Sequence, residues 1–394
     1  TVLFADVSGF TALSERLAEQ GRAGAEELTE ILNGTFTDLL TVAFGEGGDL
    51  LKYGGDALLL LFTGEHHAER ACRAAFGMRR ALRERGAIAT GRGKVTLKVS
   101  QGLHSGVFSC FLAGGDQREL IVAGRAATTV TDMETAADAG DILVSHETAA
   151  RLRPTRLGAT KGPGVLLKRS PDADPVPPPI AIAADGEPPE RFLAPAIRTR
   201  IEAGVREAEH RHVTVGFVHV FGLDDLIDSV GADEVLERLD RLVRVASQRA
   251  DDVGVCLIAT DIAGDGTKLI LTAGAPDAIE DGAGNMLSVV RAVLDEIDDL
   301  GMHAGVCAGH VFAGEVGAPF RAVYTVIGDT VNLSARLMSK AGPRELYAHT
   351  PTVEQSDVVF QTEILEPYYV KGKSRPIEAM AIGDRLGIRD RTNA

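Results

Sequence analysis

Residues 51–62, LKYGGDALLLLF, predict a tight β-hairpin, with a short strand, a Gly-Gly-Asp turn and a second, wholly apolar strand. Residues 262–273, IAGDGTKLILTA, repeat this pattern around a second Gly-Asp pair. An apolar strand and a helix with apolar residues at helical spacing precede each hairpin. The chain therefore consists of two copies of one unit, each built around a hairpin.

Each copy has the predicted element order β-α-β-β-α-β, which favours a ferredoxin-like sheet with helices on one face. Two such units commonly bury their open faces against each other, with a cleft between them. We therefore expect an α+β protein made of two ferredoxin-like domains, packed as a pseudo-two-fold heterodimer. The matching elements are an opening strand (2–7 and 213–220), a second helix (67–85 and 284–299) and a Val-x-Gly turn (122–124 and 326–328).

A proline-rich stretch separates the copies. Eight of the 16 prolines lie between Pro171 and Pro195, and such a run forms neither helix nor central strand. We expect a first domain at 1–168, a linker with a short helix at 169–210, a second domain at 211–383 and a tail at 384–394.

Composition narrows the class of protein. Apolar residues make up 45% of the 394 residues and the net charge is -15, which argues against a nucleic-acid or anionic-membrane binder. No apolar stretch approaches the roughly 20 residues of a membrane span, and no signal peptide is recognisable. The four cysteines lack metal-site spacing and are typical of a reducing compartment, so we expect a cytoplasmic location. The chain begins inside an apolar run, so we expect that it is a fragment.

Two aspartates of the first copy are expected to meet. Asp6 ends the first strand and Asp56 lies in the hairpin turn, and in a β-α-β-β unit these strands are neighbours. Paired carboxylates suit Mg²⁺ when substrate phosphates complete the coordination. In the second copy His219 replaces Asp6 and Asp265 remains alone, so we expect the metal site in the first copy.

The second copy carries a different pair. Asn332 and Arg336 are four residues apart on a predicted helix and therefore share one face, where they could hold a ribose and a phosphate. The first copy has Thr128 and Asp132 at these positions. The two copies thus retain complementary halves of one site.

Three stretches resemble class III nucleotidyl cyclases. FADVSGFT (4–11) and KYGGD (52–56) resemble the two metal-aspartate motifs, and YTVIGDTVNLSAR (324–336) resembles the base-recognition and transition-state segment. The tandem arrangement with one complete site is most similar to the soluble adenylyl cyclases and their bacterial relatives.

This resemblance implies an adenylate cyclase that converts ATP to 3′,5′-cyclic AMP and pyrophosphate by two-metal-ion catalysis. Asp6, Asp56 and the Val7 carbonyl would bind two Mg²⁺ ions, for which Mn²⁺ may substitute. Asn332 would orient the ribose and Arg336 would stabilise charge at the α-phosphate. The resemblance also places Thr325 at the base-recognition position.

The resemblance also implies lysines that contact the nucleotide, but it matches them to this sequence less directly than the aspartates. Lys268 is the only lysine near the segment that normally supplies an adenine contact, and either Lys371 or Lys373 would bind the triphosphate. Lys52 belongs to a mirrored half-site that is not expected to catalyse. Some soluble relatives bind bicarbonate there with a lysine and an arginine, but the position matching the arginine is Thr131, which argues against bicarbonate regulation.

Other readings remain open. A nucleotide-sensing pseudo-cyclase would keep the fold without turnover, and a guanylate cyclase would accept GTP. A diguanylate cyclase is disfavoured because Ala57 and Leu58 follow the Gly-Gly-Asp turn, and a non-enzymatic interaction module would bind no nucleotide. The expected partners are the substrate ATP, the other domain of the same chain and a sensor or ATPase region outside it, with no nucleic acid.

Overall fold

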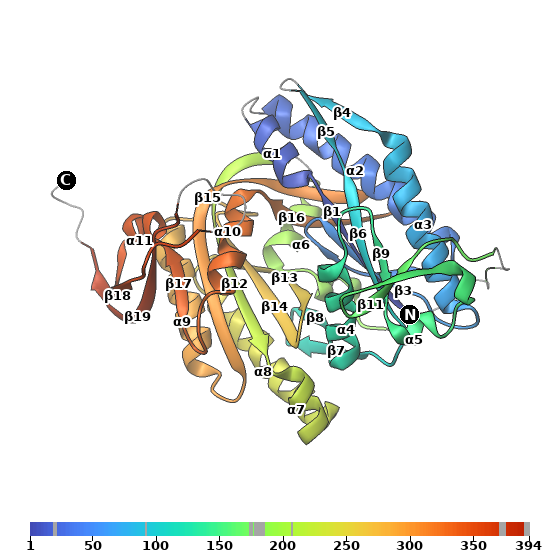
Figure 1. Cartoon of the computed structure of the whole chain (residues 1–394). Coiled ribbons are helices and arrows are strands. Elements are labelled where there is room, and N and C mark those ends of the chain that lie inside the picture. Colours follow the sequence, from blue (N-terminus) through green and yellow to red (C-terminus); the bar gives the residue numbers. More distant parts are fainter. Residues whose placement is uncertain are drawn as a thin grey trace.

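The computed structural model describes residues 1–18, 22–90, 93–172, 176, 186–205, 208–369 and 376–389. Two large sheets lie side by side, and each carries its own helices (Figure 1). The first sheet is built from residues before the proline-rich stretch and the second from residues after it. We refer to these two units as domain one and domain two.

Domain one contains a seven-stranded sheet in the order β10-β11-β9-β6-β1-β3-β2. Its helices are α1 (Phe10–Ala18), α2 (Arg22–Gly45), α3 (His67–Arg85), α4 (Arg125–Ala136) and α5 (His146–Ala149). Its strands are β1 (Val2–Ser8), β2 (Asp49–Gly54), β3 (Ala57–Leu61), β4 (Ala87–Thr90), β5 (Gly93–Thr96), β6 (Lys98–His104), β7 (Ser109–Gly114), β8 (Arg118–Ala123), β9 (Ile142–Val144), β10 (Leu157–Lys161) and β11 (Gly164–Leu167).

Domain two contains an eight-stranded sheet in the order β13-β14-β12-β15-β17-β19-β18, with β16 paired to β15. Its helices are α7 (Leu223–Val230), α8 (Ala232–Asp251), α9 (Gly282–Glu296), α10 (Asp329–Met338) and α11 (Thr350–Gln355), and α6 (Pro195–Glu202) precedes them. Its strands are β12 (Glu209–Phe221), β13 (Cys256–Ala263), β14 (Gly266–Ala273), β15 (Gly301–Ala318), β16 (Arg321–Ile327), β17 (Leu346–His349), β18 (Val358–Ile364) and β19 (Ala379–Ile388).

The two sheets share one topology. In domain one the first four long strands are ordered β6-β1-β3-β2, and in domain two the matching strands are ordered β15-β12-β14-β13. The first crossover holds two helices in each domain (α1 and α2, α7 and α8) and the second holds one (α3, α9). This is the ferredoxin-like arrangement. The expected fold class is therefore confirmed. Strand β19 continues through the first residues of the segment expected as a tail.

Each domain has its own apolar core because its crossover helices bury one face. On α2 the side chains of Leu28, Leu32, Phe36, Leu39 and Leu40 are fully buried. On α8 the matching buried set is Val235, Leu239, Leu242 and Ala246. These are the apolar positions whose helical spacing is visible in the sequence, as expected for helices that cover a sheet.

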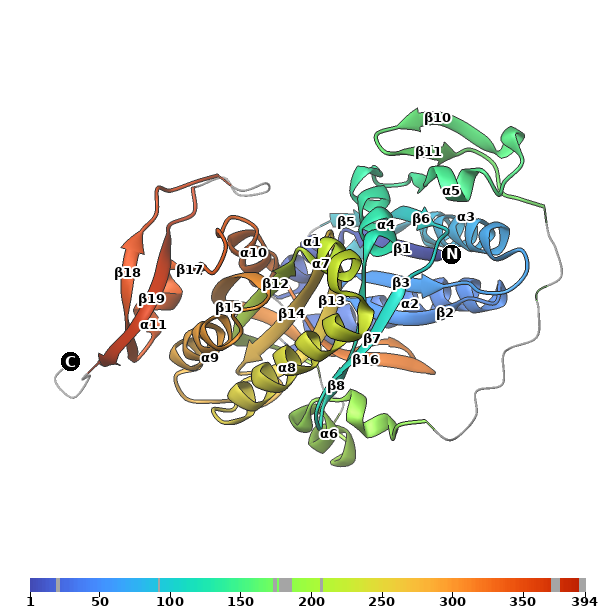
Figure 2. The ribbon, with the colours of Figure 1, turned by 90° about the horizontal axis from the view of Figure 1, so that it is seen from below.

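Two hairpins cross the boundary between the domains. The first arm, β7–β8, extends from domain one along α8 of domain two (Figure 2), where the N–H of Gly114 donates to Asp240 at 2.9 Å. The second arm, the paired outer parts of β15 and β16, extends from domain two over domain one. There the N–H of Gly317 donates to Asn33 on α2 at 2.9 Å, and the Tyr53 hydroxyl donates to the carbonyl of Arg321 at 2.6 Å. The exchange is reciprocal and fixes one domain against the other.

The hairpins β10–β11 and β18–β19 lie at opposite ends of the molecule (Figure 2). Among the described residues, no helix combines the length and the apolar character needed to cross a membrane.

Candidate functional site

A cavity of about 310 Å³ lies between the two domains. Domain one contributes its Gly-Gly-Asp turn and one face of α4, and domain two contributes β13, β14, β16 and the first turns of α10. The polar and charged side chains that line it are Asp6, Tyr53, Asp56, Thr131, Glu134, Thr135, Asp261, Lys268, Tyr324, Thr325 and Asn332.

Strand pairing brings Asp6 and Asp56 to one place, as expected. Strand β1 is antiparallel to β3, with Asp6 opposite Ala57, so the hairpin turn lies beside the end of β1. The backbone N–H of Val7 donates to the carbonyl of Asp56 at 3.1 Å. Gly55 has φ +68°, a conformation that favours glycine. The turn conformation therefore places Asp56 next to Asp6.

Burial and neighbouring acids disfavour the charged form of both carboxylates. Burial, with a contribution from the charge of Asp261, raises the pKa of Asp6 to about 6. Burial, followed by the charges of Asp6, Asp261 and Glu134, raises the pKa of Asp56 to about 8. Two half-buried carboxylates among other acids provide hard oxygen donors for a divalent cation, which would offset the repulsion.

Two further acids line the cavity and were not among the residues predicted for the site. Glu134 lies on α4 and accepts a hydrogen bond from Ser100 Oγ at 2.7 Å. Burial, and less strongly the charge of Asp6, raises the pKa of Glu134 to about 7. Asp261 comes from β13 of domain two and lies against the turn of domain one, where a Cβ on Gly54 would be 2.9 Å from Asp261 Oδ1.

A sequence signal for Asp261 does exist. It precedes Asp265 by four residues, as Lys52 precedes Asp56. Asp261 is therefore the domain-two counterpart of Lys52. The repeat alone places both residues next to the central turns.

The expected residues of domain two are only partly gathered in the cavity. Thr325 on β16 and Asn332 on α10 line it, whereas Arg336 is not among the lining residues. Arg336 lies one turn further along α10 and is half-buried. The helix is held against the sheet by Ser334 Oγ, which donates to the carbonyls of Val215 and Gly305, both at 2.9 Å.

Lys268 also lines the cavity. It lies on β14, directly opposite Asp261 on β13 and His219 on β12. Its ammonium contributes to lowering the pKa of Glu134, although burial outweighs this effect. Lys268 is thus a cation of domain two that faces the acids of domain one. The other two expected lysines, Lys371 and Lys373, lie outside the described residues.

In the mirrored half-site, the counterparts of Asp56 and Asp6 form hydrogen bonds with other residues of the protein. Asp265, the counterpart of Asp56, accepts from the backbone N–H groups of Gly222 at 3.0 Å and Asp224 at 3.2 Å. The N–H of Asp265 donates to Thr128 Oγ1 at 2.7 Å. His219, the counterpart of Asp6, is 2.9 Å from His303 through their ring nitrogens. These groups stabilise the loop before α7.

Lys52 points to domain two. Its ammonium donates to the carbonyl of Thr260 at 2.7 Å and to the Thr260 hydroxyl, and it lies 4.0 Å from the carboxylate of Glu119. The Lys52 ammonium is therefore bound by Thr260 and Glu119 of the same chain.

Among the residues that the structure describes, Asp6 and Asp56 are the pair that we consider for a metal ion. Within the described ranges, no group of three or more His, Cys, Asp and Glu side chains is arranged to hold a metal ion. Any ion at Asp6 and Asp56 would need further ligands from the backbone, from water or from a phosphate-bearing substrate.

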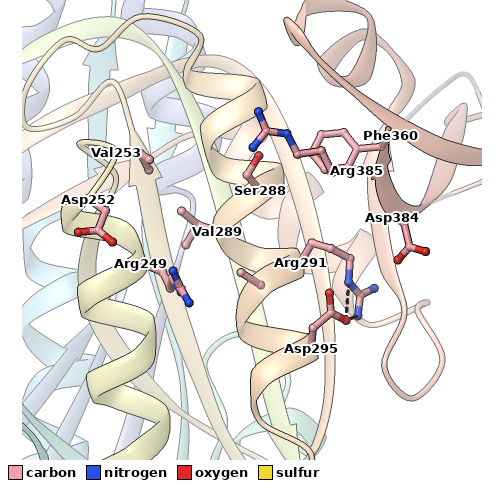
Figure 3. Close-up of a pocket in the computed structure, with 11 residues that line it drawn as sticks. Arg249, Asp252, Val253, Ser288, Val289, Arg291, Asp295, Phe360, Asp384 and Arg385 are labelled. Atoms are coloured by element: carbon pink, nitrogen blue, oxygen red, sulfur yellow. Dashed lines mark hydrogen bonds and ion pairs between the residues drawn. The ribbon is translucent and has the colours of Figure 1, made fainter. Parts of the chain in front are cut away.

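A second concavity, of about 340 Å³, lies on the outside of domain two between α8, α9 and the β18–β19 hairpin (Figure 3). Its basic side chains include two that are already paired: Arg291 with Asp295 at 2.7 Å, and Arg249 with Glu296 at 2.6 Å. It contains none of the residues singled out by the sequence. The cavity between the domains is therefore the better candidate.

A family model described as the adenylate and guanylate cyclase catalytic domain matches residues 1–167 and 205–382. It therefore matches both copies and omits the proline-rich stretch.

Among curated proteins, an uncharacterized protein of Mycobacterium tuberculosis is 33% identical over 166 residues, which are 41% of this chain and 30% of that protein. A second one from this organism is 33% identical over 193 residues, or 47% and 33% of the two chains. The chain thus spans about a third of the length of the curated relatives that it matches.

Among solved structures, the adenylyl cyclase CyaB from P. aeruginosa is 23% identical, with a TM-score of 0.41, and covers 45% of this chain and 96% of that chain. The guanylate cyclase domain of RhGC from Catenaria anguillulae, solved in complex with GTP, is 20% identical with a TM-score of 0.41. It covers 45% of this chain and 100% of that chain.

Proposed function

Because the chain belongs to the family of adenylate and guanylate cyclase catalytic domains, we propose that it converts ATP to 3′,5′-cyclic AMP and pyrophosphate in the cavity between its domains. One observation carries this proposal. The cavity combines Asp6 and Asp56 of domain one with Thr325, Asn332 and Lys268 of domain two. Under this proposal, 1–168 is the metal-binding half and 211–383 is the half that binds base, ribose and phosphate.

The carboxylate pair fits a divalent cation. Asp6 and Asp56 are half-buried. Burial and the charges of neighbouring acids hold their pKa values high, and a bound cation would reverse this effect. Held there with help from the Val7 carbonyl, two Mg²⁺ ions, or Mn²⁺ in their place, would lower the pKa of the ribose 3′-hydroxyl and neutralise the triphosphate.

The residues of domain two position the nucleotide for an in-line displacement. Asn332 orients the ribose so that its 3′-oxygen faces the α-phosphorus. The bond from this oxygen to phosphorus forms while the bond to the oxygen bridging the α- and β-phosphates breaks, and pyrophosphate leaves. Arg336 stabilises the charge that develops on the α-phosphate, a role for which its side chain must reach the cavity that it does not line in the present structure. Thr325 contacts the base, and Lys371 or Lys373 contacts the triphosphate.

A product assay tests this proposal. The purified chain is incubated with ATP or GTP and with Mg²⁺ or Mn²⁺, and the products are separated by chromatography. We expect 3′,5′-cyclic AMP from ATP. Absence of any cyclic product under all four conditions would overturn the proposal, and nucleotide binding without turnover would favour a pseudo-cyclase.

Asp261 favours a second candidate, guanylate cyclization. Its carboxylate accepts hydrogen bonds only, and guanine presents two adjacent donors, N1–H and the 2-amino group. Adenine has an acceptor at N1 and one amino group beside it. Asp261 lines the same cavity as Thr325, so the ratio of the two products in the assay distinguishes these activities.

A further inference from the structure

Strand β13 is an edge strand of the domain-two sheet, and β14 is its only partner in that sheet's order. The opposite edge carries backbone groups that need partners, because unpaired backbone groups at a buried edge are costly. Three of these groups are satisfied by side chains of domain one. The carbonyl of Leu257 accepts from Gln117 Nε2 at 2.8 Å, the carbonyl of Thr260 accepts from Lys52 Nζ at 2.7 Å, and the N–H of Thr260 donates to Glu119 Oε2 at 3.0 Å.

The Glu119 carboxylate is the centre of this contact. Its Oε2 accepts from both the N–H and the hydroxyl of Thr260, each at 3.0 Å, and its Oε1 accepts from Gln117 Nε2 at 2.9 Å. The side chains of Glu119 and Lys52 are only 8% and 11% exposed. Burial of a charge at this level requires a partner of opposite charge and several hydrogen bonds.

The Thr260 hydroxyl links the two charges. It accepts from the Lys52 ammonium and donates to Glu119 Oε2. Burial lowers the pKa of Lys52, and the charges of Glu119 and Asp261 act in the opposite direction. The protein's own carboxylate therefore offsets part of the cost of burying the Lys52 ammonium.

This contact is one residue away from the cavity. Asp261 follows Thr260 on β13 and points to the cavity, where it lies against Gly54 of the Gly-Gly-Asp turn. Lys52 lies two residues before Gly54 on β2. A shift of β13 relative to β2 would therefore move Asp261 relative to Asp56.

We propose that Lys52 and Glu119 are positioning residues, which dock the free edge of β13 onto domain one and thereby set the place of Asp261 in the cavity. Glu119 acts as a built-in anion for Lys52. A small external carboxylate or bicarbonate has no place beside Lys52 unless the Glu119 side chain is removed. The effect on nucleotide turnover rests on the proposed cyclase function, whereas the pairing of the two charges does not.

An anion-rescue experiment tests the pairing without any nucleotide. Glu119→Ala removes the carboxylate and leaves space beside Lys52. We expect about 200 mM sodium formate to raise the Tm of this variant by about 3 °C relative to the same concentration of sodium chloride. The wild-type chain and Glu187→Ala, which breaks the more exposed Arg118–Glu187 pair of the first arm, should show no such difference. Lys52→Met combined with Glu119→Ala should also lose the response.

A double-mutant cycle keeps the proposal testable if Glu119→Ala does not fold. Glu119→Gln leaves the Lys52 charge buried without its anion, whereas Lys52→Met with Glu119→Gln removes both charges. The double variant should therefore have a higher Tm than Glu119→Gln alone. Additive effects in this cycle, or no formate response by a folded Glu119→Ala variant, would overturn the pairing.

Kinetics test the positioning role. If the chain is an active cyclase, Glu119→Ala should raise KM for the nucleotide about tenfold with a smaller change in kcat, and formate should restore KM. A folded variant with reduced Tm but unchanged KM would contradict positioning. If the wild-type chain makes no cyclic product, the proposed function fails, while the formate and double-mutant results still decide the pairing.

Discussion

The backbone N–H of Val7 donates to the carbonyl of Asp56 at 3.1 Å. This hydrogen bond joins the end of β1 to the hairpin turn, and it brings the carboxylates of Asp6 and Asp56 into one cavity without a contribution from domain two. The proposed metal position is thus formed within domain one, and the nucleotide contacts are supplied by domain two. The predictions below separate these contributions.

Asp56→Asn should abolish activity without destabilising the chain. The amide has the same shape as the carboxylate but lacks the charge that would hold a cation, so we expect cyclase activity to fall by about 100-fold or more. The Tm without metal should be unchanged or higher at pH above about 8, where Asp56 would otherwise be charged beside the other acids. Asp49→Asn, at the exposed start of β2, the strand before the turn, is the matched control and should retain activity. Full activity of Asp56→Asn would refute the site.

The metal-free chain should lose stability as the pH rises. The folded-state pKa values of Asp6, Glu134 and Asp56 are raised to about 6, 7 and 8, so the folded protein holds protons that the unfolded chain releases near pH 4. Their contribution is therefore greatest at acid pH and is lost as the pH rises through the folded-state pKa values.

Thermal melts in EDTA across pH about 5 to 9 measure this loss. Asp56→Asn should show a smaller loss than the wild type. Because a cation binds the deprotonated carboxylates, Mg²⁺ should raise the Tm of the wild type most at the alkaline end. Parallel curves for the wild type and the variant would show that Asp56 does not titrate as described.

Arg336→Ala should lower kcat by about 10²–10³-fold with little change in KM, because its charge would act on the α-phosphate mainly in the transition state. Arg336 does not line the cavity in the present structure, so this prediction also tests whether it turns inward. Lys340→Ala, exposed just beyond the same helix, serves as the control. A change confined to KM would assign Arg336 to ground-state binding instead.

Asp261→Asn should change the preference between nucleotides. If the carboxylate accepts from the paired donors of guanine, kcat/KM for GTP should fall by about tenfold more than kcat/KM for ATP. The measurement is competition between the two substrates in one reaction. An equal loss for both nucleotides would mean that Asp261 does not contact the base.

Two inactive chains should not complement each other. Asp56→Asn damages the half of the site in domain one, and Arg336→Ala damages the half in domain two. If the two domains of one chain form the site, an equimolar mixture of the full-length variants should be as inactive as either alone. Recovery of up to about a quarter of wild-type activity would instead point to sites formed between chains.

The local pattern of the sequence was sufficient to predict much of the fold. The predicted helix 67–85 coincides with α3, and the second predicted helix, 284–299, lies close to α9 at Gly282–Glu296. The meeting of Asp6 and Asp56 follows from strand order, and strand order follows from the β-α-β-β pattern.

Features that depend on the packing of the two domains could not be predicted in this way. Glu134 reaches the cavity only because α4 faces domain two across the boundary, and nothing in its own segment indicates this. The repeat places Asp261 next to the turn of its own domain, but its approach to the turn of domain one depends on how the domains pack. The same holds for Glu119, whose contact with Thr260 spans 141 residues of sequence. The i, i+4 spacing of Asn332 and Arg336 was correct, yet only Asn332 lines the cavity.

The reciprocal arms would also allow like domains from two different chains to pair with each other. A pair of domain-one units would have the carboxylates but neither Asn332 nor Arg336. A pair of domain-two units would lack the carboxylates. Under the proposed function, both pairs would be catalytically inactive. Joining the domains in one polypeptide gives the correct pairing an effective concentration on the order of millimolar, well above that of a competing chain in the cell. Covalent continuity thus favours the pairing that gathers both halves of the proposed site in one cavity.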